Sequence, residues 1–171
     1  MLINTDFVNY APNSSGSEAS NVVASLIATG YDVTPFSDLS AASIAQVTEI
    51  NRALVVPELE VAAATSLFDS LGPAAVSEIR AFVQGGGVLV TMADAGGDGI
   101  ALVNALFGWR TSESATTSST YSQTDGVHAA AFRTAPLSLA AVNRTLAVSV
   151  ASLPPGGTAI YANGDAAAVT A

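Results

Sequence analysis

The chain has 171 residues, enough for one domain with a substantial core and too few for two domains of ordinary size. Charged residues make up 11% of the chain, less than half of the roughly 25% typical of soluble domains, and fourteen acids against five basic residues give a net charge of −9. The basic residues are isolated arginines, which argues against binding to nucleic acid, and the absence of cysteine excludes disulfides and thiolate chemistry.

The N-terminal part alternates short apolar runs with amphipathic segments. Strands are predicted at residues 2–4, 31–36, 53–56 and 88–92. Helices are predicted at residues 17–29, at 40–47 with Ser40 as the cap, from Pro73 to the break at Gly85, and after Asp98 as N-cap up to Phe107. Residues 58–71 read as a loop with some helix. Because this alternation is typical of right-handed βαβ units around a parallel sheet, an α/β fold is predicted.

The character of the sequence changes after Trp109. The Ser/Thr-rich residues 111–124 read either as a surface loop or as a pair of two-faced edge strands. Residues 145–150 and 158–162 alternate well enough to be strands, with a tight connection at residues 154–157. We therefore predict a single domain over residues 1–171, with a βα core at 1–109 and closing strands, which complete the sheet in a mixed sense, at 110–171.

Two segments carry a resemblance to a known family. The sequence ALVVPELE at residues 53–60, followed by EIRAFVQGGGVLVTMAD at 78–94, resembles the class I glutamine amidotransferase-like superfamily over residues 1–109. The resemblance implies a flavodoxin-like three-layer sandwich, with a mostly parallel sheet, helices on both faces and a C-terminal antiparallel portion. Catalytic members place a cysteine on a turn after the strand at 88–92. This chain has Ala93 and Asp94 there, and a carboxylate cannot form the thioester that amide transfer needs.

The N-terminal sequence resembles a narrower group. Residues 2–34 are similar to non-catalytic amidotransferase-like domains embedded in large secreted bacterial proteins, some of which carry calcium-binding repeats. This implies a structural or binding module at the cell surface or outside the cell, with other domains of a longer parent chain as partners. In such relatives a further strand follows, so the chain is expected to be a fragment. It begins with no Sec-type signal, and its apolar runs are too short for membrane insertion.

The predicted site lies where the strands end. Asp6, Glu58 and Asp94 follow three strands whose carboxyl ends share one edge of a parallel sheet, and Asp98, Glu60 and Asn4 lie nearby. Carboxylate oxygens are ligands for calcium, so Asp6, Glu58 and Asp94 are candidate metal ligands and, together with Asp98, candidate ligand-binding residues. The alternative interpretation makes them helix caps or solvated surface groups.

Two other functions stay open. A pair such as Glu58 and Asp94 is compatible with a carboxylate-dependent hydrolase or carbohydrate-active domain. The single histidine, His128, has no recognisable serine nucleophile turn to serve. The sparse charge and small-residue surface also favour a self-assembling extracellular subunit.

Overall fold

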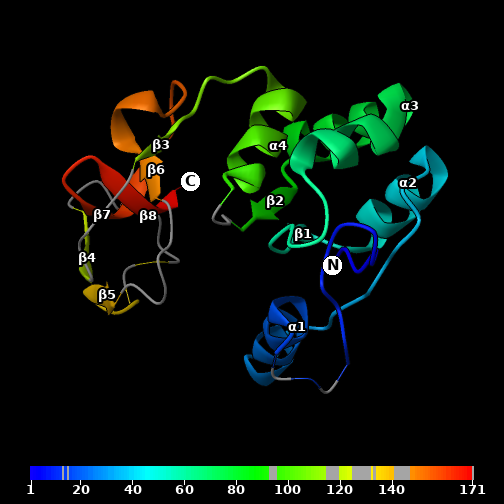
Figure 1. Ribbon diagram of the computed structural model, residues 1–171, viewed down its shortest axis with the longest axis horizontal. Helices are drawn as coiled ribbons and strands as arrows, with labels where there is room; N and C mark the ends of the chain where they lie inside the picture. Colours follow the sequence, from blue (N-terminus) through cyan, green and yellow to red (C-terminus); the bar gives the residue numbers. More distant parts are fainter. Residues whose placement is uncertain are drawn as a thin grey trace. The chain divides into compact units, whose positions relative to one another are not determined.

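The computed structural model describes residues 1–12, 14, 16–92, 96–114, 120–124, 132, 134–140 and 147–170. The chain divides into two compact units, Met1–Phe107 and Gly108–Ala171, and each is considered by itself (Figure 1). The organisation of the two units as a single domain stays a prediction.

Unit 1 contains the predicted alternation of helices and strands. Its elements are α1 (Glu18–Ala28), α2 (Ala41–Ile50), β1 (Ala53–Val56), α3 (Ala64–Gln84), β2 (Val88–Thr91) and α4 (Asp98–Phe107). Two helices begin as the sequence predicts, because the hydroxyl groups of Ser17 and Ser40 accept hydrogen bonds from the backbone N–H groups of Ser20 and Ser43. α4 begins at Asp98 itself, so this residue lies in the first turn of the helix and is not the predicted N-cap.

α3 extends further than the predicted helix because it joins two helical segments across a kink. Gly72 has φ 66° and ψ 164° inside the span, and Pro73 begins the second segment. The second segment buries Val76 and Ile79, which recur at helical spacing, leaves Val83 half-buried, and ends at the cap Gly85. Residues 64–71, predicted to be mainly loop, are helical because Leu67 and Leu71 face the core.

Backbone hydrogen bonds give the order of the extended segments in unit 1. Leu2 forms a parallel bridge with Phe36, and its N–H also donates to the carbonyl of Val55 in β1 at 2.9 Å. β1 pairs in parallel with β2 over four residues, from Ala53 opposite Val88 onward. The segments therefore lie in the order Phe36, Leu2, β1, β2. The predicted strands at 2–4 and 31–36 are reduced to this bridge.

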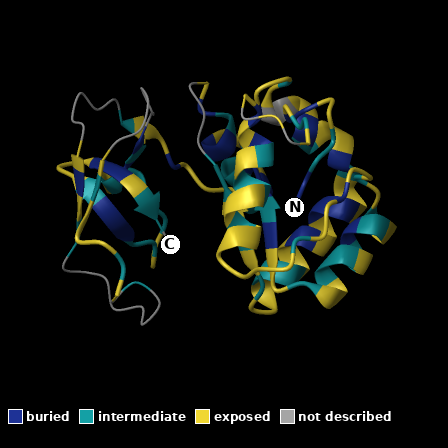
Figure 2. Cartoon of the chain, turned by 90° about the horizontal axis from the view of Figure 1, so that it is seen from below, coloured by how far each residue is buried: buried dark blue, intermediate teal, exposed yellow. Residues whose placement is uncertain are grey.

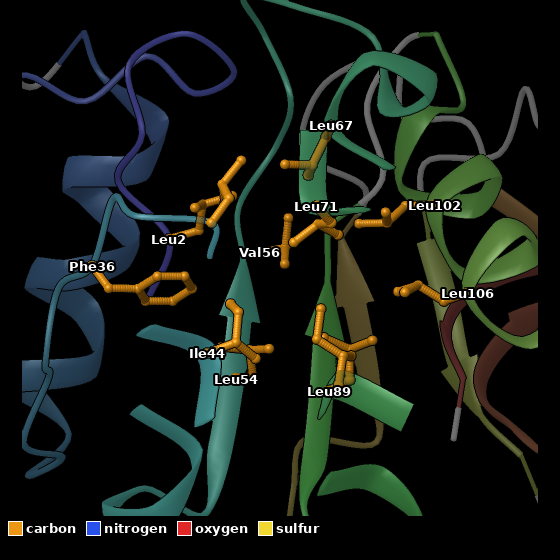
Figure 3. A pocket seen from close by; sticks show the side chains of 12 residues that line it. Leu2, Phe36, Ile44, Leu54, Val56, Leu67, Leu71, Leu89, Leu102 and Leu106 are labelled. Atoms are coloured by element: carbon orange, nitrogen blue, oxygen red, sulfur yellow. The ribbon is translucent and has the colours of Figure 1, made fainter. Parts of the chain in front are cut away.

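The core of unit 1 is formed where α2, α3 and α4 pack beside the strands. Leu102 and Leu106 of α4, Leu67 of α3 and Ile44 of α2 are each no more than 2% exposed, and Figure 2 shows such buried residues toward the interior of the unit. In Figure 3 these side chains converge with Leu54 of β1 on a cavity of about 20 Å³. That volume is room for about one water molecule, but the lining is apolar, so the cavity is a dry packing gap and no ligand site.

Unit 2 is built mainly from short strands. They are β3 (Glu113–Ser114), β4 (Thr120–Gln123), β5 (Ser138–Ala140), β6 (Ala147–Ser149), β7 (Ala159–Asn163) and β8 (Ala166–Thr170), with a 3-10 helix η2 (Val150–Ser152) after β6. Their order is β3-β6-β8-β7-β4-β5, and neighbouring strands in this order pair antiparallel. Tyr121, Ile160 and Tyr161 fill its core.

The fold class is therefore mixed α/β, and the expectation of a mostly parallel sheet is wrong for the strands that the structure describes. Among the described residues, parallel pairing is confined to β1 with β2 and to the Leu2–Phe36 bridge. The strands after Trp109 form a separate antiparallel sheet instead of closing the first one. For β7 and β8 the physical reason is the length of the link, since parallel neighbours need a crossover of about a dozen residues or more and a two-residue turn permits only antiparallel pairing.

Candidate functional site

The candidate site is the edge of unit 1 where its parallel segments end. We define this carboxyl edge as residues 4–8 after Leu2, 37–40 after Phe36, 57–61 after β1 and 96–98 at the start of α4, together with Ser17 and Glu18 at the start of α1. Ligands of open α/β sheets bind at such an edge, because the loops there are free to vary while the strands hold them in place.

Asn4 organises the first of these loops. Its Oδ1 accepts from the N–H of Asp6 and its Nδ2 donates to the carbonyl of Ser37, both at 2.9 Å. The carbonyl of Asn4 also accepts from the N–H groups of Phe7 and Val8. Asn4 therefore closes a tight turn and ties it to the neighbouring loop, and the turn presents Asp6 to solvent.

The loop after β1 lies against the first loop. The N–H of Val61 donates to the carbonyl of Phe7 at 3.1 Å, which joins the two loops by their backbones. Glu58 is half-buried and stands between the buried residues Pro57 and Leu59. The structure thus places Asp6 and Glu58 on adjacent loops at one edge, as the strand assignment predicts.

The other two predicted residues follow β2 in the sequence. Asp94 falls outside the described residues, as does His128. Asp98 lies in the first turn of α4, where the helix dipole favours a negative charge. No group of three or more acidic or histidine side chains that could hold a metal ion occurs in the described part of the chain. The three-acid site includes Asp94 and stays a prediction.

A second pair of acids belongs to the edge. Burial raises the pKa of Glu60, and the negative charge of Glu18 raises that pKa further. The sequence placed Glu60 near the site but missed Glu18. The position of Glu18 directly after the cap Ser17 could have indicated that it belongs to the edge, because the helix that follows the first strand must begin there.

The hydroxyl groups at this edge serve the backbone. Ser17 Oγ donates to the carbonyl of Asn9 at 2.6 Å, and Ser20 Oγ donates to that of Ala11 at 2.8 Å, which fixes the chain before α1. Before α2, the carboxylate of Asp38 accepts from the N–H and the hydroxyl of Ser40, and these hydrogen bonds lower its pKa. Ser17 and Ser40 therefore cap helices, while Ser20 and Asp38 hold the chain that leads into them.

The described charges near this edge are of one sign. Asp6, Glu18 and Asp38 lie in or beside its loops with Glu58 and Glu60. The described arginines of unit 1 lie elsewhere, since Arg52 precedes β1 and Arg80 donates to the carbonyls of Ala105 and Leu106 at the far end of α4. Such an edge attracts a cation and repels anionic ligands.

Comparisons with known proteins give no family for this chain: no family model, curated protein or solved structure matches it. Among the described residues, no helix combines the length and apolar character needed to cross a membrane.

Proposed function

We propose that the chain is a non-catalytic, amidotransferase-like α/β module of an exported bacterial protein, which binds calcium at its carboxyl edge and serves as a structural or binding domain. The observation that carries this proposal is the chemistry of the edge. Its charged groups are acids, the hydroxyls of Ser17 and Ser40 cap helices, and the chain has no cysteine to act as a nucleophile.

The arrangement of unit 1 supports the flavodoxin-like part of the proposal. The order Phe36, Leu2, β1, β2 corresponds to the order 2-1-3-4 of the first four strands in flavodoxin-like sheets. α2 packs on α3 and α3 on α4, while Figure 1 draws α1 on the other side of β1. In that topology the switch point lies between Leu2 and β1, where the loops carrying Asp6 and Glu58 meet.

Thermal melting with calcium tests the proposal. A cation that binds only the folded state at one hundred times its Kd stabilises by about 2.7 kcal/mol. We expect calcium to raise the Tm, and chelator to reverse the rise, in the wild-type chain but not in Asp6→Asn, Glu58→Gln or Asp94→Asn. Asp32→Asn is the matched control, because it removes one exposed carboxylate before Phe36 and should keep the full response.

Two results would contradict the proposal. If calcium leaves the Tm of the wild-type chain unchanged, the module does not bind it. Alternatively, hydrolysis of a glycoside that is lost in both Glu58→Gln and Asp94→Asn would establish the carboxylate-dependent enzyme, whose two acids must lie within about 10 Å.

Self-association is a second candidate, favoured by β2. On this strand Val88 is 53% and Val90 37% exposed, and among the described strands β2 pairs only with β1. Charged residues and proline usually protect an edge strand from pairing with another chain, and residues 85–92 contain neither. A second copy of the chain can therefore pair with β2 without repulsion between charged side chains of the two strands. Sedimentation over a range of concentrations should show a dimer that Val90→Lys abolishes; a monomer throughout would refute this candidate.

A further inference from the structure

The turn between β7 and β8 holds an Asn–Gly sequence on the surface of unit 2. Asn163 pairs with Ala166, so Gly164 and Asp165 form a two-residue hairpin turn. Asn163 and Gly164 are both exposed, and Gly164 has φ 59°, a conformation that favours glycine. A Cβ built on Gly164 would meet nothing within 4 Å, which shows how open the space around its backbone is.

This turn joins several elements of unit 2. Asn163 Nδ2 donates to the carbonyl of Thr120 in β4 at 3.0 Å. The carboxylate of Asp165 accepts from the N–H of Ala151 and the hydroxyl of Ser149, each at 2.8 Å, which connects the turn to η2 and β6. A chemical change in the turn therefore acts on β4 and β6, the two strands that flank the hairpin of β7 and β8.

We propose that Asn163 is a site of spontaneous deamidation. The backbone nitrogen of Gly164 attacks Cγ of Asn163, forming a C–N bond that closes a five-membered succinimide ring. The Cγ–Nδ2 bond breaks, and the side-chain amide leaves as ammonia with the proton from Gly164. Water then opens the ring at either carbonyl, giving aspartate or isoaspartate. No oxidant or cofactor takes part, and glycine favours the attack because no side chain shields its nitrogen.

The rate is set by opening of the turn, because Asn163 must leave its strand conformation to bring Cγ to the nitrogen of Gly164. Hairpin ends open locally far more often than a whole domain unfolds. The product carries a carboxylate where the amide stood, so the donor to the Thr120 carbonyl is lost and two oxygens face each other. The new charge also lies two residues from Asp165. Isoaspartate adds a methylene to the main chain, which disturbs the pairing with Ala166.

The full chain can be aged in mildly alkaline buffer, digested after arginine and analysed by mass spectrometry. The last peptide, residues 145–171, contains Asn163 as its only asparagine and no glutamine, so a gain of the amide-to-acid mass difference reports this residue alone. We expect this gain over time, with more isoaspartate than aspartate. In the peptide of residues 1–52, fragment ions report Asn9 and Asn51, which precede Tyr10 and Arg52, separately from its other asparagines. Asn9 and Asn51 are the internal controls and should change much more slowly.

Asn163→Gln is the matched variant, because it keeps the amide but requires a slower six-membered ring closure, and its last peptide should keep its mass. The proposal is overturned if Asn163 stays an amide while a free peptide of residues 161–166 converts fully under the same conditions. It is also overturned if the control asparagines react as fast. Asn163→Asp tests the effect of the new charge on the turn. The added carboxylate should raise the pKa of Asp165, and an unchanged pKa would refute this effect.

Discussion

The backbone conformation of Gly72 predicts how a substitution at this position changes the stability of unit 1. With φ 66° and ψ 164° it lies in a region that is essentially restricted to glycine. A Cβ placed there meets nothing within 4 Å, so an alanine would cost conformational energy and no steric clash. Gly72→Ala is therefore a clean test of how the kink before Pro73 is made.

The expected loss combines two opposing effects. Holding a non-glycine residue in this region lowers the stability by about 1–3 kcal/mol. Alanine also lowers the entropy of the unfolded chain, which raises the stability by about 0.4–1 kcal/mol. The net destabilisation should be roughly 1–2 kcal/mol. For a unit of about this size, each kcal/mol lowers the Tm by roughly 4–8 °C.

Urea unfolding followed by far-UV circular dichroism measures this loss, because the described α-helices belong to unit 1. Gly16→Ala is the matched control, since Gly16 is exposed, has no positive φ, and leaves its new Cβ 3.8 Å from Ser14. That variant should be as stable as the wild type or slightly more so. Asparagine tolerates the left-handed helical region but not ψ 164°, so Gly72→Asn should be destabilised like the alanine variant. Equal stability of Gly72→Ala and Gly16→Ala would refute the reasoning.

Two further predictions concern the core and the second unit. Leu102→Ala removes a side chain that is 1% exposed and enlarges the existing cavity. It should lower the free energy of unfolding by about 2–5 kcal/mol, measured by the same urea unfolding. A loss near zero would show that α4 does not pack as described. The hydrogen bond from Ala151 N–H, followed by that from Ser149, lowers the pKa of Asp165 from its ordinary 3.8. The stability that Asp165 contributes is thus present above pH 3.8 and is lost as the pH falls through its lower folded-state pKa. Asp165→Asn should flatten the acid limb of the stability curve of unit 2, and an unchanged limb would contradict the assignment.

Unit 1 was largely predictable because its signals are local. Ser17 and Ser40 cap helices through hydroxyl groups that reach only three residues along the chain, and the buried stripe of Val76 and Ile79 follows helical spacing. The kink at Gly72 also lies where the Gly–Pro sequence indicates it. The continuation of α3 before Gly72 was not predicted, because it depends on the burial of Leu67 in a core formed by distant residues.

Unit 2 was harder to predict because its central strand has no strand-like sequence. β8 reads AAAVT, and alanine has a low preference for strands. It forms because it lies between β6 and β7, where Ala166 and Ala167 are buried and only small side chains are needed. Such a strand is specified by its neighbours, and no local pattern reveals them.

The site shows the same division between local and distant information. Asp6 and Glu58 were predicted to lie at one edge because each follows a strand, and parallel strands share their carboxyl ends. Glu18 was missed since it follows a helix cap and not a strand. Its effect on Glu60, which lies more than forty positions further along the chain, exists only in the folded structure.

Glu60 can therefore report what the carboxyl edge binds. Its pKa is raised from the ordinary 4.5 by burial first and by Glu18 second, so the folded state holds this proton more tightly than the unfolded chain. As the pH rises through the raised pKa, the folded state loses stability relative to the unfolded one. Glu18→Gln should lower the pKa of Glu60 part of the way toward 4.5, with burial keeping the remainder. Added salt should shrink this difference, because it screens exposed charges.

Calcium at Asp6, Glu58 and Asp94 would act on the same group in the opposite direction to Glu18. A cation near Glu60, two residues from Glu58, favours its charged form and lowers its pKa. NMR titration of the Glu60 carboxyl group with calcium and with chelator measures this, and Asp32→Asn again serves as the control for a general change in charge. If calcium raises the Tm while the pKa of Glu60 stays where it was, the ion binds away from the carboxyl edge, and the proposed ligands are wrong even though the module binds calcium.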